Sequence, residues 1–216
     1  MLLVVVAVAG CTQQVRVDGD WQEGVSRKQS FSRVLVVGLS HNASGRCDFE
    51  SFLTTQIRTT GADAKSSCFL MKTTDPLTVE SVEAAVAEYG ADAVLTTVLV
   101  QADQGAKVGG KNDTRGGLDF KATGTGYASP YYYGGYRGGY GYYGIPVVYG
   151  EFRAAPLVTT VEGEVQIQSM LYATRDKTLV YELSTTANEL SSRDNALAAI
   201  TPPIAQRLQG EGLLGQ

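Results

Sequence analysis

Strand-like and helix-like segments alternate along residues 33–100, and this order constrains the fold more than any other feature of the chain. Residues 33–39 form a continuous apolar run between polar neighbours, a pattern typical of a strand buried on both faces. Strands separated by helices in this way predict parallel pairing through right-handed crossovers. The predicted elements are a strand at 33–39, a helix from Ser44 to Gly61, a strand at 63–70, a helix from Thr78 to Gly90 and a strand at 91–100.

Both predicted helices carry apolar residues at helical spacing, so each has one face to bury. Gly61 provides the stop of the first helix. Thr78 can cap the amino terminus of the second helix, which ends at Gly90. The apolar faces consist of Phe49, Phe52, Leu53 and Ile57 in the first helix and of Val79, Val82, Val86 and Tyr89 in the second.

Regular patterning returns near Val158, where apolar and polar residues alternate as far as Leu171. This alternation predicts a half-exposed antiparallel strand. The polar stretch from Thr174 to Lys177 supplies a turn, and Leu179, Tyr181 and Leu183 continue the pattern on a return strand. Residues 158–188 are therefore predicted to form a hairpin.

A last helical pattern covers residues 191–214 and closes the domain. Pro202-Pro203 lies inside this pattern and predicts either two short helices or one bent helix. The residues spaced for the buried face are Leu197, Ile200, Ile204 and Leu208. The whole chain thus predicts an α/β fold with α+β character: a mixed sheet of about five strands in the order β-α-β-α-β, then a β-hairpin and a carboxyl-terminal helix.

Residues 104–156 interrupt this order and show no convincing regular element. The stretch 124–150 contains nine tyrosines and nine glycines in 27 residues, a composition that cannot build a packed core by itself. It is interpreted either as a solvated flexible loop or as a contact element whose rings bind a protein or a glycan, with self-association as a further option. The candidate contact residues are Tyr131, Tyr132, Tyr133, Tyr136, Tyr140, Tyr142 and Tyr143.

The beginning of the chain contains a short apolar run that ends in Val8-Ala9-Gly10-Cys11. The run is too short to span a bilayer and fits the hydrophobic region of a signal peptide. Small residues directly before a cysteine resemble the lipobox of bacterial lipoproteins, which implies cleavage before Cys11 and acylation of that residue. Two or more acyl chains would hold a protein stably on a membrane. The alternative is a buried amino-terminal strand with a chance cysteine.

These patterns divide the chain into a signal segment at 1–10, a tether at 11–30 and one α/β domain at 31–216 that is interrupted by the insert at about 104–156. Thr12 follows Cys11. In the lipoproteins that the segment resembles, an Asp at that position commonly signals inner-membrane retention. The resemblance therefore favours the outer membrane of a Gram-negative cell, with the domain facing the periplasm.

Three cysteines are present, and lipidation of Cys11 would leave Cys47 and Cys68 as a pair. An even pair in an exported protein indicates a disulfide. If the strands at 33–39 and 63–70 are parallel neighbours, both cysteines fall at the same edge of the sheet. The disulfide is favoured, with two partly buried free thiols as the alternative.

Composition and the few reactive residues argue against several function classes. The formal net charge is -4, whereas nucleic-acid binders are normally basic. The single histidine, His41, excludes a multi-histidine metal centre within one chain. Ser40-His41 is better explained as a polar loop pair than as catalytic residues. Asp48 and Glu50 are assigned to the helix dipole rather than to a general acid/base pair. No enzyme activity, metal or cofactor is predicted.

The strand Val34-Leu35-Val36-Val37-Gly38 before a helix, the later segment from Gly90 to Leu95, and the closing hairpin and helix carry a resemblance. They resemble bacterial envelope lipoproteins whose α/β domain is like that of the curli-secretion lipoprotein CsgG and the amino-terminal domain of TolB. The resemblance implies an interaction or scaffolding role in the envelope.

Two further hypotheses remain. One is a subunit of an outer-membrane export channel, although residues 104–156 lack the alternation of membrane-spanning hairpins. The other is an envelope hydrolase that uses Ser40 and His41.

Overall fold

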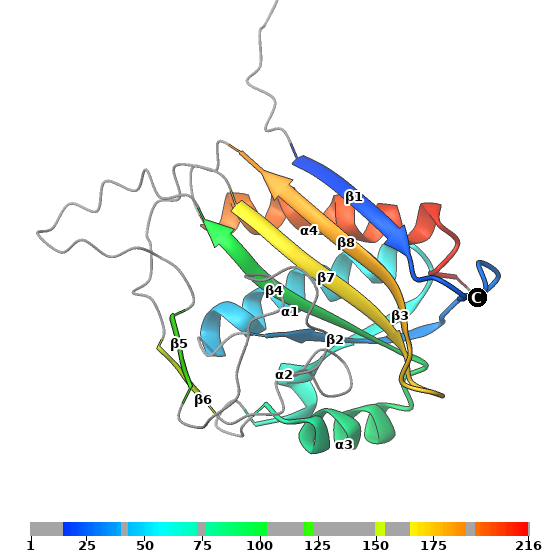
Figure 1. Ribbon diagram of the computed structural model, residues 1–216, viewed down its shortest axis with the longest axis horizontal. Coiled ribbons are helices and arrows are strands. Elements are labelled where there is room, and N and C mark those ends of the chain that lie inside the picture. Colours follow the sequence, from blue (N-terminus) through cyan, green and yellow to red (C-terminus); the bar gives the residue numbers. More distant parts are fainter. Residues whose placement is uncertain are drawn as a thin grey trace, which may run out of the picture.

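Figure 1 shows the computed structural model of the chain, in which helices cover the faces of one sheet. The structure describes residues 15–39, 43–72, 77–102, 119–122, 150–153, 165–188 and 193–215. The strands are β1 (Val15–Trp21), β2 (Arg33–Gly38), β3 (Asp63–Ser66), β4 (Ala93–Ala102), β5 (Asp119–Ala122), β6 (Gly150–Arg153), β7 (Val165–Ala173) and β8 (Leu179–Ala187). The helices are α1 (Ala43–Thr59), α2 (Ser67–Leu70), α3 (Val79–Tyr89) and α4 (Arg193–Gly210).

The main sheet is mixed and has six strands in the order β1-β8-β7-β4-β2-β3. β2 pairs in parallel with β3 and with β4, whereas the pairs β4-β7, β7-β8 and β8-β1 are antiparallel. The predicted α/β class and the parallel strands at its centre are therefore confirmed. The sheet has one strand more than expected because β1 joins its edge.

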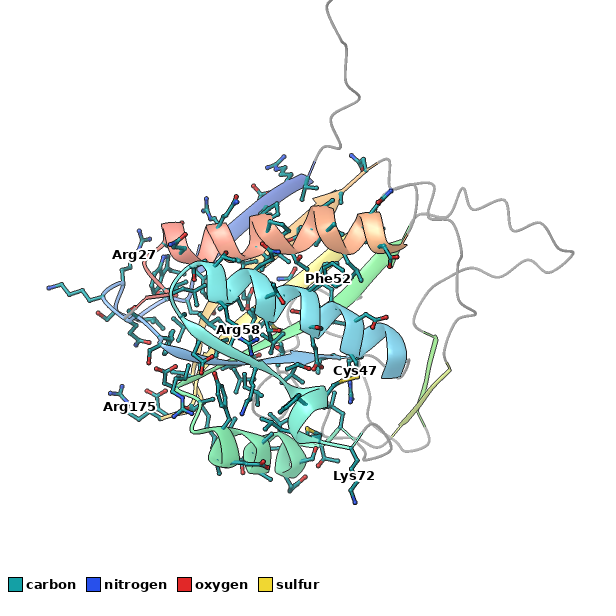
Figure 2. All side chains as sticks on the ribbon, turned by 180° about the vertical axis from the view of Figure 1, so that it is seen from behind. Arg27, Cys47, Phe52, Arg58, Lys72 and Arg175 are labelled. Carbon is teal, nitrogen blue, oxygen red and sulfur yellow. A yellow bond between two sulfur atoms is a disulfide. The ribbon has the colours of Figure 1, made fainter. Side chains whose placement is uncertain are left out.

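Two hydrophobic cores lie on opposite faces of the sheet. α1 and α4 lie side by side over one face, which Figure 2 shows from behind the view of Figure 1. The short α2 and α3 belong to the other face and pack over β2 and β4. Five of the eight side chains predicted for the buried faces of α1 and α4 are in the first core, and Phe49 packs against it; the five are Leu53, Ile57, Ile200, Ile204 and Leu208.

The boundaries of α3 follow the predicted signals closely. The Thr78 hydroxyl accepts a hydrogen bond from the backbone N–H of Ser81, and the Ser81 hydroxyl accepts one from the N–H of Thr78 in return. This capping box satisfies donors that the first turn leaves free. Gly90 follows the helix with φ +68°, a left-handed conformation that favours glycine.

The prediction of a tether over residues 11–30 was wrong from Val15 onward. β1 lies against β8, with Val15 opposite Ala187 and Trp21 opposite Tyr181. Valine and tryptophan alternate with charged residues in this segment, the pattern of a half-buried strand. The alternation typical of a strand was therefore present in the sequence. Its partner strand β8, however, lies more than 150 residues further along the chain, at Leu179–Ala187.

Two other expectations were wrong in detail. The strand predicted at 63–70 ends at Ser66, where the Ser66 hydroxyl caps the short helix α2 by accepting a hydrogen bond from the backbone N–H of Cys68. The region 104–156, predicted to lack regular elements, contains β5 and β6, which pair antiparallel as a separate two-stranded sheet.

α4 is one continuous helix, so the alternative of two short helices was wrong. Pro202 and Pro203 lie inside it and remove two backbone donors from the helical ladder. Phe52 also departs from prediction, since its side chain is 38% exposed whereas Leu53 beside it is fully buried. The buried face of α1 is thus rotated away from Phe52, whose label in Figure 2 lies between α1 and α4.

The carboxyl end of β1 is fixed by Trp21. Its ring meets the Tyr181 ring edge-on, with centroids 5.5 Å apart, and its Nε1 donates to Glu211 at 2.9 Å. Arg207 of α4 donates through Nε to the Tyr181 hydroxyl at 3.1 Å and pairs with Glu211 at 3.0 Å. Burial raises the pKa of Tyr181 above its usual value. β1 is therefore joined to both β8 and α4.

Gly19 lies under the Tyr181 ring and tests whether β1 belongs to the fold. A methyl group added at Gly19 would lie 2.7 Å from Cζ and 2.8 Å from Cε1 of Tyr181. We expect Gly19→Ala to lower the free energy of unfolding by about 1–3 kcal/mol, because the ring must move from its packed position. Urea denaturation measures the change. Gly210→Ala is the matched control, since no heavy atom lies within 4 Å of its added methyl, and equal effects at both positions would contradict the expectation.

Candidate functional site

The carboxyl ends of β2 and β3 form the sheet edge at which the sequence analysis placed Cys47 and Cys68. Ser40 and His41 lie outside the described residues, and so do Cys11 and the candidate tyrosines between Tyr131 and Tyr143. Their suggested roles stay predictions. Among the residues that the structure does describe, this edge holds the two remaining cysteines and a cluster of buried polar side chains.

The predicted disulfide is present. Cys47, in the second turn of α1, is bonded to Cys68 in α2, with their Cα atoms 5.5 Å apart. Figure 2 shows the bond next to the label of Cys47. The bond closes a segment with a sequence separation of 21, and closing a loop of that length in the unfolded chain is worth about 3 kcal/mol of stability. It ties the first helix to the end of β3.

The Glu50 side chain is fully buried and is the centre of the polar cluster. Its Oε1 accepts hydrogen bonds from the backbone N–H of Gly38 and from the Ser67 hydroxyl, both at 2.8 Å. Its Oε2 accepts from the Ser66 hydroxyl at 2.6 Å and from the backbone N–H of Cys68 at 2.9 Å. One carboxylate thereby joins α1 to the end of β2, the end of β3 and the start of α2.

Arg46 lies one helical turn before Glu50 and is only 4% exposed. Its Nε is 3.7 Å from Oε1 of Glu50 and donates a hydrogen bond to Sγ of Cys68 at 3.3 Å. The side chain crosses Gly38, where an added Cβ would lie 2.8 Å from Cγ of Arg46. Its Nη2 atom has no hydrogen-bond partner. The guanidinium therefore neutralises the buried carboxylate beside the disulfide.

The surroundings of Glu50 correct its assignment to the helix dipole. α1 begins at Ala43 and has no acidic residue in its first turn, so Asp48 and Glu50 both lie too far along the helix. A carboxylate that already accepts four hydrogen bonds is suited to holding segments together rather than to abstracting a proton. No group of three or more His, Cys, Asp or Glu side chains within the described ranges could hold a metal ion.

Arg46 and Glu50 were not predicted as a buried pair, although their spacing carries the signal. They precede Leu53 and Ile57 at intervals of four, three and four residues, which places all of them on one helical stripe. Charged residues on the buried stripe of a helix require a partner, because an unpaired charge is costly away from water. An Arg and a Glu one turn apart on such a stripe therefore indicate a buried ion pair.

A row of paired residues crosses the sheet near this edge. Ala102 of β4 is opposite Val165 of β7, Val165 is opposite Ala187 of β8, and Ala187 is opposite Val15 of β1. The beginning of β1 is therefore in line with the two strand ends that flank residues 103–164. Neighbouring strands are about 4.8 Å apart, so the row spans about 14 Å.

None of the described helices is long and apolar enough to cross a membrane.

No protein-family model and no curated protein matches the chain. Among solved structures, the chain is similar to two structures of PelC from Paraburkholderia phytofirmans, both of them dodecamers and one a single-residue variant. The TM-score is 0.45 in both comparisons, with 13% and 12% identity. The matches cover 95% and 94% of this chain and 100% of each PelC chain. Similarity at this level does not assign a function.

We expect Glu50→Gln to destabilise the protein by about 2–4 kcal/mol, because the new amide NH₂ would face a hydrogen-bond donor and Arg46 would lose its counter-charge. Urea denaturation under oxidising conditions measures the loss while the disulfide stays intact. Glu88→Gln, an exposed position on α3, is the control and should change stability by less than about 0.5 kcal/mol. A Glu50→Gln protein as stable as the control would show that the carboxylate is not needed at this edge.

Proposed function

We propose that this chain is a non-enzymatic envelope lipoprotein, anchored at Cys11, which acts as an interaction or scaffolding module. The Val8-Ala9-Gly10-Cys11 sequence after a short apolar run supports the anchor. The Glu50 carboxylate supports a structural rather than a catalytic role for the sheet edge, since both of its oxygens already accept two hydrogen bonds each.

The observation that carries the proposal is the position of β1. Val15 is four residues after Cys11, and a fully extended chain of that length spans at most about 14 Å. A lipid at Cys11 would therefore hold the domain close to the bilayer surface instead of on a long tether. Val15 is also aligned with Ala102 and Val165, so the strands that flank the tyrosine- and glycine-rich insert begin and end near the anchor.

The insert is the proposed contact element. Tyrosine combines a large apolar ring with a hydroxyl, and it is enriched where proteins contact other proteins and membrane interfaces. Glycine lets the backbone fit the contacted surface. The proposed partner is an envelope protein or a glycan at the periplasmic side of the outer membrane, and no cofactor is involved.

The anchor is tested by metabolic labelling with a fatty acid and by membrane fractionation of the full-length protein. We expect the native chain to carry the label and to sediment with outer membranes, and Cys11→Ala to lose both properties. The control is Cys47→Ala with Cys68→Ala, which removes the disulfide but leaves the proposed lipid site. An unlabelled native protein would disprove the anchor.

The contact role is tested by deleting residues 124–150 and, separately, by replacing the seven candidate tyrosines with serine at constant length. We expect both proteins to unfold at the native urea concentration, because a tyrosine- and glycine-rich segment of this composition cannot build a packed core by itself. We also expect cross-linking in whole cells to show that both lose a partner that the native protein binds. An unchanged set of cross-linked partners would contradict the role of the insert.

A further inference from the structure

No described strand pairs with the outer edge of β1. Within the described part of the chain, β1 pairs with β8 alone. The backbone N–H of Gln22 donates to the Val180 carbonyl at 3.0 Å, which continues the β1-β8 ladder by one step. Residues of an antiparallel strand alternate between bonding to one side and to the other. The N–H and C=O groups of Val15, Val17 and Gly19 therefore point away from β8.

The side chains of β1 form two rows, one partly buried and one exposed. On the core side, Val15 and Val17 are only partly buried against the main core, which ends at this strand. On the opposite side, Arg16 and Asp18 are exposed, with 79% and 58% of their side-chain surface accessible, and form an ion pair at 2.7 Å. Asp20 continues this exposed row. An edge with open backbone groups and half-covered valines is a template for another strand.

We propose that this edge pairs with the same edge of a second copy of the chain, antiparallel, around a two-fold axis at Val17. This register places each Val17 opposite the other and Val15 opposite Gly19 of the partner subunit. The outward backbone groups of these residues then meet as donor–acceptor pairs. A two-fold arrangement closes on itself, so it extends the sheet to a dimer without producing an open fibre.

Charge complementarity selects this register. With Val17 on the axis, Arg16 lies directly opposite Asp18 of the partner subunit, and the same pair forms again on the other side of the axis. A shift that puts Asp18 on the axis would place two aspartates opposite each other, which is unfavourable. The valines meet on the core side and the ion pairs form on the exposed side, so both rows of β1 gain partners in the same arrangement.

Site-specific disulfide cross-linking tests the register. Full-length protein with Cys11→Ser is used, so that the introduced cysteine is the only free thiol. Arg16→Cys protein is mixed with Asp18→Cys protein under mild oxidation. Residues opposite each other in a non-hydrogen-bonded pair have Cα atoms about 4.5 Å apart, within the range of a disulfide. We expect a covalent dimer in the mixture and little in either variant alone, because identical positions then lie too far apart.

The hairpin turn between β7 and β8 offers a matched control. Arg175 and Asp176 are also an exposed ion pair, at 3.4 Å, and Arg175 is labelled in Figure 2. A mixture of Arg175→Cys and Asp176→Cys proteins should give only background cross-linking. The proposal fails if the β1 mixture gives no more dimer than this control. It also fails in its register if Asp18→Cys alone forms a dimer as readily as the mixture.

Charge reversal gives an independent test in solution. Arg16→Asp and Asp18→Arg should each weaken the dimer about tenfold or more, because two attractive pairs become repulsive. The double variant should restore the native dissociation constant, since the pairs are present again with opposite order. Sedimentation velocity of the Cys11→Ser full chain measures the association. A native protein that remains monomeric, or a double variant no tighter than the single ones, would overturn the proposal. Neither test depends on the lipid anchor.

Discussion

One buried carboxylate connects the elements at the carboxyl edge of the parallel strands. Glu50 has no exposed surface, and its two oxygens accept hydrogen bonds from β2, from the end of β3 and from α2. Without the carboxylate, the buried Gly38 N–H and Ser67 hydroxyl would lose this acceptor, so the ends of β2 and β3 and the start of α2 depend on it together. Arg46 balances its charge, and the Cys47–Cys68 bond joins the same elements covalently. These contacts therefore hold together the end of β2, the end of β3, α1 and α2, where the chain passes between the sheet and its helices.

The sequence was sufficient for elements that have a clear period and a clear stop. The predictions made from the apolar run of β2, the stripe of α1 apart from Phe52, the capping residue Thr78 and the final Gly90 agree with the structure. The disulfide could be favoured as well, because parallel pairing of β2 and β3 places both cysteines at one edge. These features depend on residues close in the sequence or on one strand–helix–strand crossover. Local hydrophobic patterns predict contacts over such short separations.

Features that depend on distant partners were predicted less well. β1 has good strand alternation, but only β8 and the Tyr181 ring over Gly19 show that it belongs to the sheet. The sequence assigned Glu50 to the dipole of α1. Its role as a buried acceptor depends on donors in β2 and α2, which are distant in the sequence. The strand at β3 stopped early because the Ser66 hydroxyl caps a helix there, a local choice that competes with continuing the sheet.

The pairing of β1 with β8 also has a consequence for the order of folding. The first strand of the fold has no partner until almost the whole domain has been synthesised, and Phe31 likewise bonds to Leu213 beyond α4. Contacts between such distant segments form late, because a long loop must be closed before they contribute. A nascent chain with this connectivity cannot complete its sheet while it is still being made. The parallel strands β2, β3 and β4 can pair through their short crossovers first, so β1 is the last strand to be added although it is the first to be made.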